Sequence, residues 1–141
     1  MSGISVLEKI TMKILLDTHI LLWALSGSSK LSSKARKIIC DEGNDIYISI
    51  ISPWEIEIKH DKFPDKMSLD SKELLSFCRA AGYKRLSIRP EHISLLGELG
   101  QYTNADPFDR MLICQAKAED MILLTHDHKI TSYKDKHILR V

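Results

Sequence analysis

The stretch that decides the fold is Lys13-Ile14-Leu15-Leu16-Asp17-Thr18-His19-Ile20-Leu21-Leu22-Trp23-Ala24-Leu25, which holds one acidic residue, Asp17, in an otherwise apolar run. Its start, 14–16, is short and apolar, as in a strand buried on both faces of a sheet. A helical pattern follows Asp17, with Thr18 as the expected N-cap and Gly27 past the end. In open α/β sheets, ligands bind beyond the carboxyl ends of parallel strands. Asp17 is therefore predicted to face a cleft at that edge.

Length and composition indicate one soluble globular domain. The chain has 141 residues, of which 44% are hydrophobic and 28% charged, and we expect a domain over residues 12–141 after an N-terminal extension, 1–11. With 20 Lys and Arg against 19 Asp and Glu, the net charge of +1 gives no global sign of a nucleic-acid partner. We find no signal peptide or membrane-spanning run, which predicts a cytoplasmic protein without a membrane partner. Three widely spaced cysteines, Cys40, Cys78 and Cys114, fit small core residues in a reducing compartment.

The rest of the chain alternates between strand and helix patterns. Further strands are predicted at 45–51, 83–88, 121–125 and 137–141, and further helices at 33–43, 53–62, 71–81, 90–100 and 107–118. Ser52 is the expected N-cap of the helix at 53–62, with Glu55 reaching back toward it, and Asp70 with Glu73 forms a capping box for the helix at 71–81. This alternation predicts a three-layer α/β/α fold with a mostly parallel central sheet of four to five strands.

Four acidic residues are predicted to meet at one edge of that sheet. Asp17 and Asp127 follow strands, Glu55 lies in the first helical turn after a strand, and Asp109 can reach the same edge from a helix start. At a separation of ~5 Å and an effective dielectric of ~20, each pair of charges repels by roughly 3 kcal/mol, so the cluster requires a cation or protonation. Ligands that are all oxygen favour Mg²⁺ or Mn²⁺, and these ions suit phosphodiester hydrolysis.

Each acid also has a purely structural explanation. Glu55 and Asp109, taken singly, fit a first helical turn, where a negative charge complements the helix dipole. Asp106, directly before Pro107, is the most natural N-cap of its helix. Asp17 fits such an explanation least, because its neighbour already offers a cap and because it interrupts an apolar run.

Other site chemistries match the sequence less well. His126-Asp127-His128 is a candidate zinc pair, but no further His or Cys shows ligand spacing, which favours an acid between solvated histidines. A HAD-type phosphatase also places an Asp after its first strand, but it needs D-x-D, and His19 occupies the second position. A phosphoacceptor receiver domain wants an acidic pair before its first helix, and Asp17 has no acidic neighbour. We expect His19 to line the cleft or to pack.

Four stretches together resemble the motifs of PIN-domain proteins, and most closely those of VapC toxins of bacterial type II toxin–antitoxin systems. They are Leu16-Asp17-Thr18-His19, Ser52-Pro53-Trp54-Glu55-Ile56-Glu57-Ile58-Lys59, Asp106-Pro107-Phe108-Asp109-Arg110-Met111-Leu112-Ile113 with Gln115-Ala116, and Leu124-Thr125-His126-Asp127. The resemblance runs from about Met12 to Val141, and its most specific part is the D-P-F-D-R block. One departure is Asn104, which stands where the family commonly has a His.

The resemblance implies a Mg²⁺- or Mn²⁺-dependent endoribonuclease, inhibited by a VapB-type antitoxin that inserts a segment into the cleft, and a homodimer. It places the family's acidic quartet on Asp17, Glu55, Asp109 and Asp127, with Asp106 as a further candidate acid. A transfer RNA, a ribosomal RNA and a messenger RNA all stay open as the target. An inactive PIN fold that binds RNA or protein is the alternative function.

Chemistry assigns different roles to these acids. Asp17 and Asp109 are expected to bind the metal directly, Glu55 to bind it or orient the attacking water, and Asp127 to bind a second metal or act through water. Three cations lie beside the acids in sequence and are candidates for contacts with RNA phosphates, or else solvated surface charges: Lys59, Arg110 and Lys129.

Overall fold

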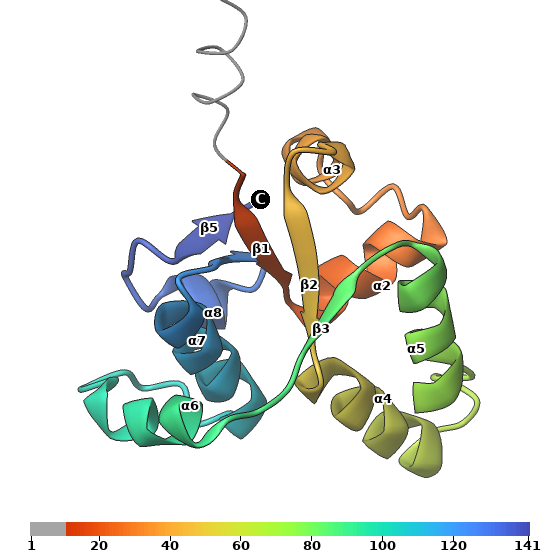
Figure 1. Cartoon of the computed structure of the whole chain (residues 1–141). Helices are drawn as coiled ribbons and strands as arrows, with labels where there is room; N and C mark the ends of the chain where they lie inside the picture. The colour runs from red at the N-terminus through yellow and green to blue at the C-terminus, as the bar shows by residue number, and fades with distance from the viewer. Residues whose placement is uncertain (1–10) are drawn as a thin grey trace, which may run out of the picture.

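A five-stranded, fully parallel sheet in the order β3-β2-β1-β4-β5 forms the centre of the molecule (Figure 1). The computed structural model describes residues 11–141, so the predicted N-terminal extension lies outside the described residues except for Thr11. The strands are β1 (Lys13–Leu16), β2 (Asp45–Ser49), β3 (Lys84–Leu86), β4 (Ile122–Thr125) and β5 (Ile138–Arg140). The helices are α2 (Thr18–Ser26), α3 (Ser33–Cys40), α4 (Ile51–Lys62), α5 (Ser71–Ala80), α6 (Pro90–Ser94), the 3-10 helix η1 (Leu95–Glu98), α7 (Pro107–Glu119) and α8 (His128–Thr131).

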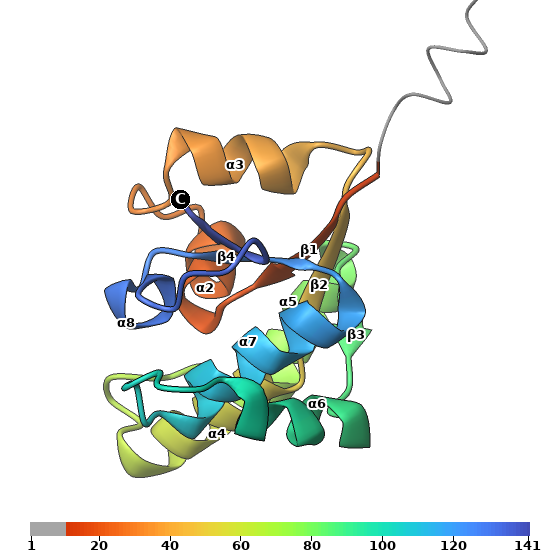
Figure 2. The same ribbon diagram turned by 90° about the vertical axis from the view of Figure 1, so that its left-hand side faces the viewer.

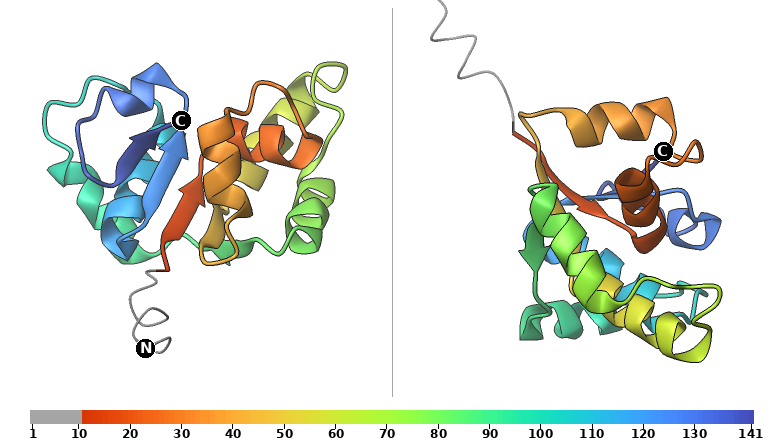
Figure 3. Two further views of the ribbon diagram at one scale, coloured as in Figure 1. Left: turned by 90° about the horizontal axis from the view of Figure 1, so that it is seen from above. Right: turned by 90° about the vertical axis from the view of Figure 1, so that its right-hand side faces the viewer.

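The central strand β1 is buried on both faces, as its apolar run predicts. Leu15 pairs with Tyr47 of β2 and Leu123 of β4, and Figure 3 shows β4 and β5 on one side of β1. Ile14 and Leu16 pack in a core with α2, α3, α4 and α5, whereas Leu15 packs in a second core with α7 and its neighbours. The two cores confirm the three-layer α/β/α fold, and every strand pair is parallel.

Local sequence signals fix most helix ends. Asp70 caps α5 and forms the predicted capping box with Glu73, and Ser32 caps α3. Gly27 ends α2 with φ of 65°, a conformation that a residue without a Cβ adopts at little cost. These ends set the directions in which the helices leave the sheet.

Two predicted helix starts were wrong. The N-cap of α2 is Asp17, whose side chain accepts a hydrogen bond from the Ile20 N–H, and Thr18 is the first helical residue. Helix α4 begins at Ile51, so Ser52 lies inside its first turn and does not cap it. The reason is that β2 passes into α4 without a loop, which leaves the Ser52 hydroxyl free to bond across to α2.

The prediction for the cysteines was also wrong at one position. Cys78 and Cys114 are buried, but Cys40 is exposed, because it is the last residue of α3 and lies at an open helix end. None of the three forms a disulfide with another described residue. Within residues 11–141, every helix is too short or too polar to cross a lipid bilayer.

Candidate active site

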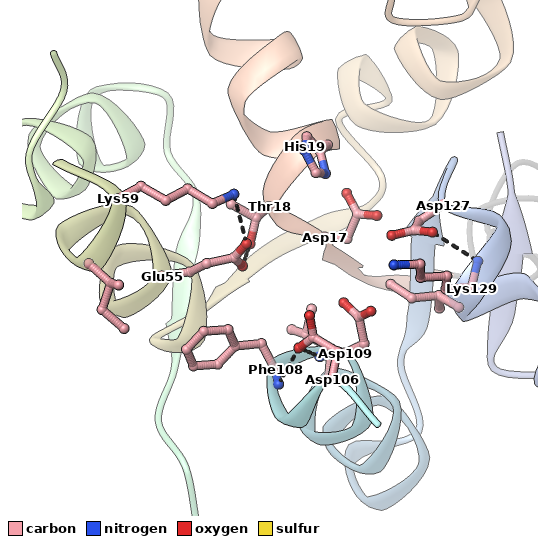
Figure 4. A pocket seen from close by; sticks show the side chains of 13 residues that line it. Asp17, Thr18, His19, Glu55, Lys59, Asp106, Phe108, Asp109, Asp127 and Lys129 are labelled. Atoms are coloured by element: carbon pink, nitrogen blue, oxygen red, sulfur yellow. Dashed lines mark hydrogen bonds and ion pairs between the residues drawn. The ribbon is translucent and has the colours of Figure 1, made fainter. Parts of the chain in front are cut away.

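A cleft of about 340 Å³ opens at the carboxyl edge of the sheet (Figure 4). Its lining includes all five acids that the sequence singled out: Asp17, Glu55, Asp106, Asp109 and Asp127. They come from five places in the chain, namely the end of β1, helix α4, the start of α7 and its first turn, and the end of β4. Parallel connectivity therefore brings the ends of β1 and β4 to one edge, and Asp109 comes from the first turn of α7, which packs beside the sheet (Figure 2).

Asp17 is the most deeply placed of these acids, with 3% of its surface exposed. Its Oδ1 accepts the Ile20 N–H at 2.8 Å, and its Oδ2 accepts the hydroxyl of Thr125. Its own N–H donates to the Leu124 carbonyl, which ties α2 to β4. Burial raises the pKa of Asp17, although these hydrogen bonds oppose the shift, and the Asp127 charge raises it further. A cation in the cleft would favour the ionised form.

Glu55 is held by hydroxyl groups and a lysine. The Thr18 hydroxyl donates to its Oε1 at 2.9 Å, and the Lys59 ammonium donates to its Oε2 at 3.1 Å. The Ser52 hydroxyl lies 2.9 Å from the Thr18 hydroxyl. Because Thr18 donates its only hydroxyl hydrogen to Glu55, Ser52 is the donor in this bond. This buried Ser52–Thr18 pair fixes Glu55 in position and joins α4 to α2.

Asp109 stands in the first turn of α7 and points into the cleft. Its Oδ2 accepts an N–H of the Asn104 side chain at 2.9 Å. The pKa of Asp109 is raised to about 6, mainly by burial and also by the charges of Asp106, Asp127 and Glu55, while the Asn104 hydrogen bond opposes the shift. Asp106 caps α7, as predicted, by accepting the N–H groups of Phe108 and Asp109.

Asp127 follows β4 and is the N-cap of α8. Its side chain accepts the Lys129 N–H at 2.8 Å, and its own N–H donates to the Thr125 hydroxyl oxygen at 3.0 Å. Thr125 thus bonds to both Asp127 and Asp17, and it is fully buried. This one side chain sets the distance between the two acids.

The acids suit a hydrated hard cation better than a closed metal cage. Among the described residues, no three Asp, Glu, His or Cys side chains stand close enough to enclose a metal by themselves. Mg²⁺ keeps several of its waters and needs only one or two carboxylates from the protein. The like charges that raise the pKa of Asp109 are those a divalent ion would neutralise. The donor set of carboxylate oxygens therefore fits Mg²⁺ or Mn²⁺.

The predicted cations separate into two groups. Lys59 and Lys129 line the cleft, and Figure 4 shows them on opposite sides of it. Arg110 does not line it; its Nη1 donates to the carbonyls of Tyr102 at 3.2 Å and Asn104 at 3.1 Å. His19 lines the cleft and is exposed.

Sequence reasoning missed the polar residues that hold the acids. Thr18 was assigned a capping role and Ser52 likewise, while Thr125 and Asn104 received none. Their partners lie far away in the chain, as with Thr125 and Asp17, so no local pattern indicates the contact. The available signal was a hydroxyl residue next to Asp17 for Thr18 and at a strand end for Thr125; Ser52 and Asn104 carried no such signal.

Comparison with protein families matches residues 14–136 to the PIN domain, and this match covers most of the chain. The chain belongs to the PIN domain family. No match was found among curated proteins.

Solved structures show the same fold at low sequence identity. VapBC2 from Rickettsia felis, bound to a DNA fragment from their promoter, matches with a TM-score of 0.67 and 18% identity, over 92% of this chain and 98% of that one. A toxin–antitoxin complex from Klebsiella pneumoniae matches with a TM-score of 0.62 and 19% identity, over 89% of this chain and 95% of that one. VapBC-1 from nontypeable Haemophilus influenzae matches with a TM-score of 0.59 and 17% identity, over 86% of this chain and 92% of that one. This chain therefore shares its fold with these proteins.

Proposed function

We propose that this chain is a Mg²⁺- or Mn²⁺-dependent endoribonuclease that acts as a VapC-type toxin. The observation that carries the proposal is the convergence of Asp17, Glu55, Asp109 and Asp127 on one cleft in a PIN-domain chain. Like charges in a shared cleft destabilise the fold unless a ligand neutralises them. A multivalent cation offsets the mutual repulsion of several carboxylates.

The residues of the cleft divide the chemistry among themselves. Asp17 and Asp109 would hold the metal, which when bound activates water and stabilises the leaving oxygen of a phosphodiester. Glu55, which accepts hydrogen bonds from Thr18 and Lys59, would bind the metal or orient the attacking water. Asp127 would bind through water or hold a second ion. Lys59 and Lys129 offer positive charge to RNA phosphates on either side of the cleft.

The direct experiment incubates the purified chain with a mixed RNA pool in Mg²⁺, in Mn²⁺ or in EDTA. We expect cleavage with either metal and none in EDTA. In Asp17→Asn and Asp109→Asn, cleavage should fall at least about 100-fold, because metal stabilisation of the transition state is worth several kcal/mol. Asp65→Asn, an exposed acid outside the cleft, is the matched control. Binding of RNA without cleavage in Mg²⁺ and Mn²⁺ would instead support the alternative, an inactive PIN-fold binding module. Sequencing the new 5′ ends would identify the target.

The proposed partner is a VapB-type antitoxin, and the proposed site of action is the cytoplasm. Support comes from the family and from structural neighbours that are described as VapBC or toxin–antitoxin complexes. Expression of this chain alone should arrest growth, and co-expression of an adjacent small antitoxin gene should restore it. Normal growth with folded chain that binds metal would contradict the toxin role. A homodimer is proposed on the same grounds, and light scattering would measure it.

A further inference from the structure

A second hollow adjoins the acidic cleft and shares one wall with it. It has a volume of about 370 Å³, and most of its lining is apolar, contributed by residues such as Ile51, Trp54, Ile88, Leu96, Phe108 and Met111. Phe108 lines both the hollow and the acidic cleft. In Figure 4 its ring extends from α7 toward α4, and this side chain is the wall that the hollow and the acidic cleft share. A polynucleotide with one phosphate in the cleft therefore has its neighbouring nucleotide next to this shared wall.

Trp54 leaves an aromatic surface open at this place. It directly precedes Glu55 in α4, and 53% of its surface is exposed, although a large aromatic side chain gains much from burial. Its ring lies 5.0 Å from the ring of Phe108 at an interplanar angle of 74°. The two rings therefore form a corner, in which a flat group can stack on one ring and meet the other.

Arg110 supplies a fixed polar group to the same hollow. Its Nη1 is engaged by the carbonyls of Tyr102 and Asn104, and its guanidinium lies 5.6 Å from the Tyr102 ring centre. The hydrogen bonds within residues 11–141 use only Nη1, so other N–H groups of this anchored fork can reach a ligand. An apolar pocket with one rigid planar donor suits a heteroaromatic ring with acceptor atoms at its edge.

We propose that this hollow holds an unpaired nucleobase of the RNA strand whose phosphate occupies the acidic cleft. The base stacks on Trp54, and Arg110 donates to its edge. This inference rests on the proposed function, and it deepens that function by assigning a subsite for one unpaired base of the substrate to the hollow at Trp54. A base in a duplex is already stacked and paired, so its face cannot reach an aromatic side chain.

Fluorescence tests the stacking directly. The chain has two tryptophans, so Trp23→Phe leaves Trp54 as the only reporter. The probe is a short unstructured oligoribonucleotide with Ca²⁺ in place of Mg²⁺, and a gel of the same sample checks that the RNA stays intact. We expect the probe to quench Trp54, a probe with one abasic site at the subsite to quench it less, and duplex RNA to leave it unchanged.

Cleavage in Mg²⁺ supplies the second measurement. Trp54→Ala should lower kcat/KM for the single-stranded probe about tenfold, a loss of ~1.4 kcal/mol that lies within the usual range for base stacking on an aromatic side chain. Trp54→Phe should keep most of the activity, and the Mg²⁺-induced rise in melting temperature should be unchanged in both variants. Phe77→Ala is the matched control, since Phe77 is 54% exposed and lines neither the hollow nor the cleft.

The outcomes separate this inference from the proposed function. Wild-type cleavage with unchanged rates and binding in Trp54→Ala would overturn the base subsite alone. Quenching that depends on the base, without any cleavage, would overturn the nuclease but keep the subsite. A change of molecular mass in solution on Trp54→Ala would assign the hollow to contact with a second copy of the chain and overturn the proposal. Equal quenching by duplex and single strand would also overturn it.

Discussion

Polar side chains from other parts of the chain hold the acids of the cleft: Thr125 donates to Asp17, Thr18 to Glu55 and Asn104 to Asp109. Asp17, Glu55, Asp109 and Asp127 follow from strand ends and helix starts, because parallel connectivity brings such positions to one edge. Asn104 could not be assigned, because its amide reaches Asp109 only through the path of the 102–106 loop. Its side chain donates to Asp109 at 2.9 Å.

Asn104→Ala should therefore weaken the site without dismantling it. Asn104 donates to Asp109 and to the Tyr102 hydroxyl, both at 2.9 Å, and Tyr102 in turn donates to the Lys129 carbonyl. We expect Mg²⁺ affinity to fall about 10- to 100-fold, as is usual when a residue that orients a metal ligand is lost. Calorimetric titration with Mn²⁺ and Mg²⁺ measures this. Unchanged affinity would mean that Asp109 keeps its position without Asn104.

The raised pKa of Asp109 predicts how stability depends on pH without metal. Folding raises this pKa from 3.8 to about 6, so the folded state favours the protonated form. The stability that this carboxyl contributes is complete below pH 3.8 and is lost as pH rises through 6. Asp109→Asn, which does not ionise, should match wild type at pH 3.5 in EDTA. At pH 8 it should be more stable by about 1 kcal/mol, after screening by solvent in the open cleft.

Melting curves of the two proteins from pH 3.5 to pH 8 provide the measurement. The melting temperature of a domain of this size shifts by a few degrees for each ~1 kcal/mol of stability, so the expected difference between the two proteins is readily measured. An offset that stays constant across this range would show that Asp109 is not desolvated by its surroundings. If the variant is less stable than wild type at pH 8, the main effect of Asp109 is to stabilise the N-terminus of α7.

At the scale of the elements, periodicity and caps located most helices and strands, and contacts between elements decided the exceptions. The capping box before α5 lies on the surface, where local signals act alone, and its prediction was confirmed. The start of α4 was missed because the Ser52 hydroxyl bonds to Thr18 of α2, a partner 34 residues away. The helix α8 was not predicted, since four residues are too few to show a period.

Thr125 joins β4, β1 and α8, and we expect its loss to affect both stability and function. In Thr125→Val, Asp17 loses a hydrogen-bond donor and the Asp127 N–H loses an acceptor. Because Thr125 is fully buried, water does not replace these hydrogen bonds. The free energy of unfolding should fall by about 1–3 kcal/mol. Because both acids then lose their spacing, cleavage should fall as well.

Asp70→Ala is the control for that comparison. It removes the N-cap of α5, far from the cleft, and should cost about 1 kcal/mol. Its cleavage rate should stay at the wild-type level at temperatures where it is folded. If both variants lost activity equally, general instability would explain the effect of Thr125→Val, and the role of Thr125 in spacing the acids would be wrong.

At the scale of the whole molecule, the alternation of strands and helices predicted the three-layer fold, and the family match agrees with it. The strand order β3-β2-β1-β4-β5 was not predicted, because order depends on how crossovers pack. The fold places β1 at the centre, and so puts Asp17 at the middle of the cleft. We propose that this cleft holds a divalent cation.

Melting curves of wild type and Asp109→Asn, each in EDTA and in millimolar Mg²⁺ at fixed ionic strength, test directly for this cation. A ligand that binds the folded state adds RT ln(1 + [L]/Kd) to stability, about 2.7 kcal/mol at a hundredfold excess over Kd. Wild type should therefore melt several degrees higher in Mg²⁺, and Asp109→Asn should barely respond. Equal responses of the two proteins, or none in wild type, would contradict the assignment of the cleft as a metal site.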